Sequence, residues 1–272
     1  MEQFCDLHTH SVFSDGFCSP AQILDAAVAK GLSAVALTDH DSIDGLPDFL
    51  QAAAGKPLEA IAGAEFAVTY QGTELHLLGL YIPEEAFSQI GQLMQQVHRR
   101  REQCVYDLVE SLNRAGYRLD FSELKAIARG QLTRAHVASA LEQQGYLSAS
   151  QAFQTLLKPG AGHYRSPSRL DFLSTLDLIR SVGAVPVLAH PFLNMSRKEL
   201  AGFLPFAKQL GLVGMECLYS AYDEATTAAA FALAESCGLL PSGGSDFHGS
   251  IRPEAVLGMP PVPYRFAQAL KP

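Results

Sequence analysis

Two histidines and two aspartates lie close together near the start of the chain, in the stretch Asp6-Leu7-His8-Thr9-His10 and at Asp15. Successive side chains of a strand point to opposite faces, so an extended backbone would direct His8 and His10 into the same space. Asp15 follows in a Ser-Asp-Gly turn that can bring its carboxylate toward them. Two imidazoles and a carboxylate suit Zn, Mn or Fe. A His-x-His pair also arises by chance, so a metal site requires further ligands elsewhere.

Further imidazoles and carboxylates occur beside other predicted strands. The apolar run 34–37 is typical of a strand buried on both faces, and it leads into Thr38-Asp39-His40. Predicted strands at 58–65, 74–81, 184–189 and 239–243 place more such side chains at or near strand ends, where α/β barrels keep their active sites. The candidate metal ligands are therefore His8, His10, Asp15, His40, Glu65, His76, His190, Asp246 and His248.

The number of these candidates argues for metal binding. Any one histidine at a strand end is more often a hydrogen-bonded core residue, but six of the nine histidines in the chain lie there. Burying so many imidazoles and carboxylates at one barrel mouth is costly unless metal ions neutralise them. One ion takes about four to six ligands. We therefore expect two or three divalent ions (Mn, Fe or Zn), which Glu65 and Asp246 can bridge, and such a cluster suits phosphoester hydrolysis.

Two blocks of alternating strands and helices must position these ligands. The first block reads β-α-β-α-β-β, with helices predicted at about 20–30 and 45–54. The second block combines strands at 184–189, 212–218 and 239–243 with helices at 173–182, 197–210 and 223–238. This alternation predicts an α/β architecture.

Between these blocks, helical periodicity replaces the strand pattern. Apolar residues recur at helical spacing from Ile90 to Leu112, and shorter helical patterns follow at 122–128, 134–143 and 148–157. The predicted domains are a barrel begun by 1–84, an all-helical insertion at 85–160, and a barrel completed by 161–272.

Composition limits the classes of partner. The chain has 272 residues, of which 48% are hydrophobic, enough for one large domain with an insertion. A formal net charge of −8 argues against broad binding to duplex DNA. Five cysteines without a C-x-x-C pair indicate reduced thiols in the cytoplasm. We expect no signal peptide and no membrane partner, because the N-terminal region is acidic and no apolar run approaches about 18 residues.

Seven short motifs, taken in order, resemble the PHP (polymerase and histidinol phosphatase) family over essentially the whole chain. They are His8-Thr9-His10, Asp15-Gly16, Thr38-Asp39-His40, Gly63-Ala64-Glu65, His76, Ala189-His190-Pro191 and Gly244-Ser245-Asp246-Phe247-His248. The resemblance implies a distorted (β/α)7 barrel of PHP type, with an all-helical insertion and a trinuclear metal site. It also implies three ligand sets: His8, His10, Glu65 and Asp246 for one ion, Glu65, His76 and His190 for the second, and Asp15, His40 and His248 for the third.

The helical insertion resembles one branch of this family, the small stand-alone phosphoesterases. That branch includes a 3′,5′-nucleotide bisphosphate phosphatase and a 5′-to-3′ exoribonuclease acting on short RNA. Thr133-Arg134-Ala135-His136 resembles its Arg-x-His element, which implies that Arg134 and His136 bind substrate phosphate. Alternatively, Thr133 caps an ordinary helix and Arg134 lies on its surface. Members of this branch often carry a lysine just before a Gly-Tyr pair at the end of the insertion. In this chain the lysine, Lys158, is displaced from that position, and His163 precedes Tyr164. This difference concerns nucleotide specificity and leaves the metal ligands unchanged.

The resemblance implies hydrolysis of nucleotide phosphate esters by a metal-bound hydroxide. Asp246, His190 and His248 are the expected catalytic residues, the two histidines as candidates for proton transfer. Ser220, after a predicted strand, is another candidate substrate contact beside Arg134 and His136, whereas the neighbouring Tyr219 can equally pack in the core.

Other functions stay open at this point. The substrate can be a non-nucleotide metabolite such as histidinol phosphate instead of a nucleotide or short RNA. An amidohydrolase would normally need a metal-bridging lysine, and none lies at a predicted strand end. A non-catalytic PHP module is less expected, because such modules lose ligands and none is missing here.

Overall fold

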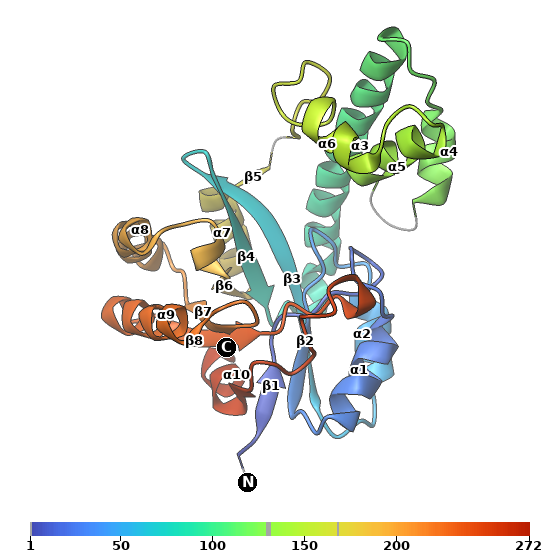
Figure 1. The fold of residues 1–272 in the computed structure, drawn as a ribbon. Helices are drawn as coiled ribbons and strands as arrows, with labels where there is room; N and C mark the ends of the chain where they lie inside the picture. Colours follow the sequence, from blue (N-terminus) through green and yellow to red (C-terminus); the bar gives the residue numbers. More distant parts are fainter. Residues whose placement is uncertain (1, 129–131, 168) are drawn as a thin grey trace. The chain divides into compact units, whose positions relative to one another are not determined.

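The computed structural model describes residues 2–128, 132–167 and 169–272, which form two compact units. The barrel unit comprises Met1–Gln92 and Arg169–Pro272, and the helical unit comprises Leu93–Ser168. Helix α3 (Phe87–Arg114) begins in the first unit and continues into the second (Figure 1). The helical unit consequently starts and ends eight residues farther along the chain than the predicted insertion, 85–160.

Seven of the nine strands found in the described residues follow one another around the barrel-shaped sheet of the first unit. They are β1 (Phe4–Asp6), β2 (Ala34–Leu37), β3 (Glu59–Tyr70), β4 (Thr73–Leu80), β6 (Val185–Ala189), β7 (Gly214–Tyr219) and β8 (Leu240–Gly244), in that order around the sheet. Two backbone hydrogen bonds nearly close the ring between β8 and β1, from the amide of Leu7 to the carbonyl of Gly243 (3.2 Å) and from that of Asp246 to His8 (3.0 Å). The predicted α/β class and distorted barrel are confirmed.

Strand β4 is what distorts the barrel, because it runs antiparallel to both β3 and β6 while the other ring neighbours are parallel. Gln71 and Gly72 join β3 to β4 with φ angles of 48° and 84°, as a two-residue hairpin turn requires. The hairpin extends β3 to Tyr70, so the prediction that this strand ends at Glu65 is wrong. Glu65 instead lies in the middle of β3, paired with Leu78.

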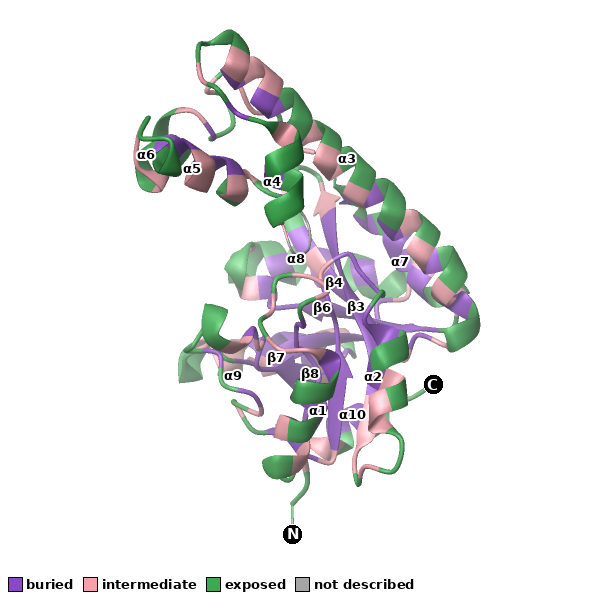
Figure 2. Ribbon diagram, turned by 90° about the vertical axis from the view of Figure 1, so that its right-hand side faces the viewer, coloured by how far each residue is buried: buried purple, intermediate pink, exposed green. Residues whose placement is uncertain are grey.

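The helices of the barrel unit largely follow the sequence pattern. They are α1 (Pro20–Ala29), α2 (Leu46–Ala53), α7 (Phe172–Ser181), α8 (Arg197–Gln209), α9 (Glu224–Cys237) and α10 (Tyr264–Leu270). Ser19 caps α1 in a capping box with Gln22, as expected of a Ser-Pro start. Apolar residues such as Leu7, directly after β1, Leu78 on β4 and Val187 on β6 form part of the buried core, and each contributes about 1.5–3 kcal/mol by burial. The strands of the barrel are accordingly mostly buried (Figure 2).

One α-helix and two short strands of the described residues lie outside the predicted elements. They are α10 and two strands of two residues each, β5 (Leu170–Asp171), which pairs with β3, and β9 (Val262–Pro263), which pairs with β1. Such short strands carry no alternation from which they could be predicted.

The helical unit has its own core. Helices α4 (Phe121–Ile127), α5 (Arg134–Gln143) and α6 (Ala149–Thr155) follow α3, close to the predicted ranges. Asp120, Thr133 and Ser148 cap the three short helices with their side chains. The buried residues include Leu108, Leu112, Val137 and Leu141. In the part of the chain that the structure describes, no helix combines the length and apolar character needed to cross a membrane.

Candidate metal centre

The extended backbone after β1 directs His8 and His10 into one cluster, as the alternation predicts. Both are fully buried, and their ring centroids lie 5.0 Å apart. Thr9, between them, turns the other way and donates its hydroxyl to the carbonyl of Ala36 (2.6 Å). Gly244 permits the close approach of β8, since a Cβ there would lie 2.4 Å from the Cβ of His8.

Glu65 lies at the centre of the cluster and is fully buried. Its Oε1 is 2.7 Å from Nδ1 of His76 and 2.9 Å from Nε2 of His190. Its Oε2 is 2.8 Å from Nδ1 of His40. The same Oε2 lies 3.3 Å from Nε2 of His8 and 3.4 Å from Nε2 of His10. One carboxylate thus lies within 3.4 Å of imidazole nitrogens from five histidines.

Asp246 lies against the same imidazoles from the end of β8. Its Oδ1 is 3.0 Å from Nε2 of His10. Its Oδ2 accepts hydrogen bonds from the hydroxyl of Tyr219 and from Nη1 of Arg252, both at 2.8 Å. Both oxygens of this carboxylate are therefore oriented by the protein.

His248 and Asp15 form the outer part of the cluster. Nδ1 of His248 is 2.7 Å from the carbonyl oxygen of Asp246, which makes this nitrogen the donor. Nε2 of His248 is consequently the free nitrogen, and it lies 3.2 Å from Oδ1 of the half-exposed Asp15. In a neutral imidazole, that nitrogen carries the lone pair that binds metals.

The backbone is strained at two of the predicted ligands. His190 and Asp246 have φ angles of 25° and 54°, in the left-handed region that residues with a side chain rarely occupy. Each such residue costs about 1–3 kcal/mol, and these conformations gather at functional sites.

The side chains of the cluster fit divalent metal ions. Donor atoms within 4.8 Å of one another form four overlapping groups: His10, Asp15, His40 and His248; His8, His10 and Asp246; His8, Glu65 and His190; and His40, Glu65 and His76. Several buried nitrogen and oxygen atoms of these side chains have no hydrogen-bond partner: Nε2 of His8, both ring nitrogens of His10, Oε2 of Glu65 and Nε2 of His248. Unpaired polar atoms are costly to bury, and metal ions would satisfy them.

These groups overlap with the ligand sets that the family resemblance implies. The first group is the predicted set of Asp15, His40 and His248 with His10 added. His76 and His190 fall into different groups, although both contact Oε1 of Glu65. All nine predicted ligands belong to at least one group, so the structure brings the whole predicted set together.

The cluster shifts the pKa values of its members in opposite directions. Burial would raise the pKa of Glu65, but His40, His8 and the other imidazoles lower it well below the ordinary value. Burial would lower the pKa of His76, but Glu65 outweighs it and raises that pKa to about 10. Burial and the charge of His40 together lower the pKa of His10 to about 3. Metal-free protein therefore carries protonated histidines around the ionised Glu65.

These shifts predict that metal binding releases protons at neutral pH. Metal ions bind neutral imidazole, whereas the raised pKa values of His8, His40 and His76 favour the protonated form of these groups in metal-free protein. The affinity for Mn²⁺ should therefore rise with pH through neutral pH and level off only near 10, the raised pKa of His76. Calorimetry in two buffers of different ionisation enthalpy measures this release, and identical heats in both buffers would contradict it.

Glu216, on β7, is a functional candidate that the sequence reasoning missed. It is fully buried, and its Oε1 lies 2.9 Å from Nδ1 of His8. Its Oε2 accepts a hydrogen bond from the backbone amide of His190 (2.6 Å). A carboxylate that holds the far nitrogen of a ligating imidazole fixes its orientation. One signal was available, because a glutamate inside an otherwise apolar strand requires a polar partner.

Replacing Glu216 with glutamine should weaken metal binding by about 10- to 100-fold. The amide oxygen can still accept from His8, but the NH₂ group would then face the amide of His190, which is also a donor. The measurement is a Mn²⁺ titration of metal-free protein, with Glu235→Gln on the exposed side of α9 as the matched control. Equal affinities of the two variants would remove Glu216 from the site.

The three predicted substrate contacts, Arg134, His136 and Ser220, belong to none of the ligand groups. Arg134 and His136 lie in the helical unit, where Nη1 of Arg134 donates to the carbonyl of Leu157 (2.9 Å) and its guanidinium lies 4.4 Å from the ring centre of Tyr164. Nδ1 of His136 accepts from the amide of Thr133 (3.1 Å) in the cap of α5. Ser220 is exposed after β7. Their contact with substrate stays a prediction.

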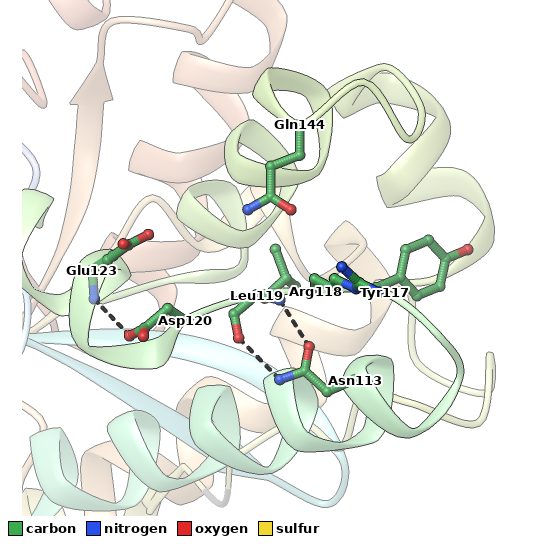
Figure 3. Close-up of a pocket in the computed structure, with 7 residues that line it drawn as sticks. All are labelled: Asn113, Tyr117, Arg118, Leu119, Asp120, Glu123 and Gln144. Atoms are coloured by element: carbon green, nitrogen blue, oxygen red, sulfur yellow. Dashed lines mark hydrogen bonds between the residues drawn. The ribbon is translucent and has the colours of Figure 1, made fainter.

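A hollow of about 450 Å³ lies within the helical unit and is lined by Asn113, Tyr117, Arg118, Leu119, Asp120, Glu123 and Gln144 (Figure 3). The amide of Asn113 is already paired with the backbone of Leu119, and Asp120 caps α4. None of the predicted ligands or substrate contacts lines it.

Comparison with known proteins identifies the family. Residues 6–161 match the PHP domain family. A 5′-3′ exoribonuclease of Haemophilus influenzae is 31% identical, with 89% of each chain aligned. A 3′,5′-nucleoside bisphosphate phosphatase of Chromobacterium violaceum is 30% identical over 89% of this chain and 86% of its own. A phosphoribosyl 1,2-cyclic phosphate 1,2-diphosphodiesterase of Eggerthella lenta is 29% identical over 90% and 94%.

A solved structure from Bifidobacterium adolescentis, with a proposed metal-dependent phosphoesterase activity, shares the fold. Its TM-score is 0.79 at 24% identity, with 98% of this chain and 95% of that chain aligned. The fold and the clustered ligands define a metal-dependent hydrolase of phosphate esters. The chain belongs to the PHP family, as its motifs indicated.

Proposed function

We propose that this enzyme hydrolyses phosphate esters of nucleotides, either 3′,5′-bisphosphate nucleotides or short 5′-phosphorylated RNA. The observation that carries the proposal is the convergence of all nine predicted ligands on Glu65 and its neighbours. The exoribonuclease and the bisphosphate phosphatase among the relatives support the nucleotide. The cyclic phosphodiesterase supports phosphoester hydrolysis with a different substrate. A non-nucleotide metabolite is therefore the alternative that the test must address.

Two or three Mn, Fe or Zn ions, held by the nine ligands, would activate water and stabilise the negative charge that develops on the phosphate oxygens. Asp246 is held for this role by Tyr219 and Arg252. His248 keeps Nε2 available through the hydrogen bond at Nδ1, so this atom can bind a metal or exchange a proton with the leaving group. His190 is restrained by its backbone bond to Glu216, which directs Nε2 toward Glu65.

An exposed aromatic side chain beside the metal centre favours a nucleotide over a smaller metabolite. Phe17 is 62% exposed, and its backbone amide donates to the carbonyl of His248 (3.1 Å). Stacking of a base on an aromatic ring contributes about 1–3 kcal/mol. Phe17 thus offers a surface for the base of a substrate whose phosphate lies at the metal ions.

Replacing Phe17 with alanine should raise KM for adenosine 3′,5′-bisphosphate by about 10-fold, the equivalent of about 1.4 kcal/mol of lost stacking. The KM for p-nitrophenyl phosphate, which carries no nucleobase, should change much less. Steady-state kinetics on the two substrates measure the difference. An equal change for both would show that Phe17 does not contact the base.

The proposal is tested by phosphate release in the presence of Mn²⁺, with adenosine 3′,5′-bisphosphate, a 5′-phosphorylated oligoribonucleotide and histidinol phosphate as substrates and Asp246→Ala as the control. Fast release from the bisphosphate, or stepwise release of mononucleotides from the RNA, supports the nucleotide and distinguishes the two activities. Preference for histidinol phosphate would overturn it.

We also propose that this enzyme is cytoplasmic and that it acts on small phosphorylated substrates and not on duplex DNA. All five cysteines are free, as expected in a reducing compartment. The net charge of −8 disfavours the many phosphate contacts that duplex DNA requires.

A further inference from the structure

Arg252 is the cationic side chain in closest contact with the metal centre among the residues of the barrel unit that the structure describes. It follows the short helix η3 (Gly249–Ile251), directly after the Asp246-Phe247-His248 motif. Its Nη1 donates to Oδ2 of Asp246 (2.8 Å), while Oδ1 of the same carboxylate faces His10. A single carboxylate group therefore separates the guanidinium from the imidazole cluster.

The guanidinium retains donors that can bind a ligand. Its side chain is 45% exposed, and Oδ2 of Asp246 is the partner that the described residues supply. Guanidinium carries five N–H donors in a planar fork that matches the oxygens of phosphate. Tyr219 holds Asp246 Oδ2 independently, so the carboxylate does not depend on Arg252 alone for its position.

Two other arginines, Arg169 and Arg134, are engaged differently. Arg169 pairs with Glu74 (2.6 Å), which itself lies 3.4 Å from His76, so a carboxylate stands between this arginine and the cluster. The guanidinium of Arg134 is bonded to Leu157 and lies over Tyr164 within the helical unit. Arg252 combines direct contact with a predicted ligand and a half-exposed side chain.

We propose that Arg252 binds the phosphate group of the substrate that is cleaved at the metal centre. The proposal rests on the proposed phosphoesterase function and adds a substrate-binding residue from the barrel unit itself. Arg252 is 45% exposed and contacts Oδ2 of Asp246, whereas Oδ1 of the same carboxylate faces the fully buried His10. A phosphate at the mouth of the site would therefore contact the guanidinium and the metal ions together. A charge-assisted, bidentate contact of this kind is a strong one.

The test is calorimetric binding of inorganic phosphate, the product, to Mn²⁺-loaded protein. Wild type is compared with Arg252→Ala and Arg252→Lys, each at a Mn²⁺ concentration that saturates it. Arg252→Ala should bind phosphate about 10- to 100-fold more weakly, and Arg252→Lys should recover only part of the loss, because lysine lacks the fork. The matched control is Arg265→Ala, which removes an exposed arginine on α10 that pairs with Glu2.

The outcomes separate this proposal from the function on which it rests. Unchanged phosphate affinity in Arg252→Ala would overturn the role of Arg252, whatever the substrate. An equal loss in the Arg265→Ala control would also overturn it, because the effect would then be one of net charge. Weaker phosphate binding in Arg252→Ala supports the role, even if wild type proves to prefer histidinol phosphate to nucleotides and the nucleotide proposal fails.

Discussion

Replacing Glu65 with alanine is expected to abolish phosphate release, with a fall in kcat/KM of more than about 1,000-fold. Such a factor corresponds to about 4 kcal/mol, within the several kcal/mol of charge stabilisation that bound metal supplies. Glu65 belongs to two of the four ligand groups and lies within 3.4 Å of imidazoles from five histidines. No other carboxylate among the described residues contacts so many of the candidate ligands. The variant should therefore also lose most of its bound Mn²⁺.

The same substitution has a second consequence in metal-free protein. Glu65 is the buried counter-charge of the protonated histidines, and removing one partner of a buried ionic cluster costs about 3–5 kcal/mol. The free energy of unfolding of metal-free Glu65→Ala at pH 7 should therefore fall by about 3–5 kcal/mol. Saturating metal should not restore this loss fully, because the variant lacks the central ligand. Glu59→Ala is the matched control, because Glu59 lies on the same strand but pairs with Tyr264 and Lys271. Wild-type metal content in Glu65→Ala would contradict the account of the centre.

Replacing Asp6 with alanine is expected to lower the free energy of unfolding by about 3–6 kcal/mol, through the exposure of buried donors that lose their acceptor. Asp6 is fully buried and does not belong to any ligand group. Its Oδ1 accepts from the amides of Ser245 (2.9 Å) and His8 (3.3 Å). Its Oδ2 accepts from the hydroxyl of Ser245 (2.6 Å) and the amide of Gly258 (2.8 Å). One carboxylate thus joins β1 to the segment after β8.

Urea denaturation of metal-free protein measures this effect, with the exposed Asp25→Ala on α1 as the control. Asp6→Asn should be intermediate, since its amide oxygen keeps some of the hydrogen bonds while its NH₂ group faces other donors. A loss below about 1 kcal/mol in Asp6→Ala, no greater than that of one ordinary hydrogen bond, would mean that the carboxylate does not hold the barrel closed.

The sequence predicted those parts of the site that follow from local pattern. The alternation after β1 placed His8 and His10 on one side, and the apolar run before His40 identified a buried strand. Glu65 was predicted as a ligand and lies in the cluster, although the end of its strand was misplaced. The hairpin that lengthens β3 depends on the turn at Gln71–Gly72, which lacks the usual Asn-Gly or Asp-Gly signal.

The partners that orient the ligands could not be predicted in the same way. Glu216 reaches His8 across 208 positions of the chain, and Asp6 reaches Ser245 across 239. Contacts of this separation depend on closure of the barrel, which places the ends of β1, β7 and β8 side by side. Neither hydrophobic periodicity nor motif spacing records such closure. Arg252 was missed for a related reason, because a lone arginine in a loop has no local pattern that distinguishes it from a surface residue.

The most direct test of the account is a titration of metal-free protein with Mn²⁺ while phosphate release from adenosine 3′,5′-bisphosphate and bound Mn²⁺ are followed together. The account predicts that activity is absent without metal, rises as two to three Mn²⁺ ions bind per chain, and does not appear in Glu65→Ala at any Mn²⁺ concentration. Full activity in the presence of a chelator, or a chain that binds no Mn²⁺, would contradict it.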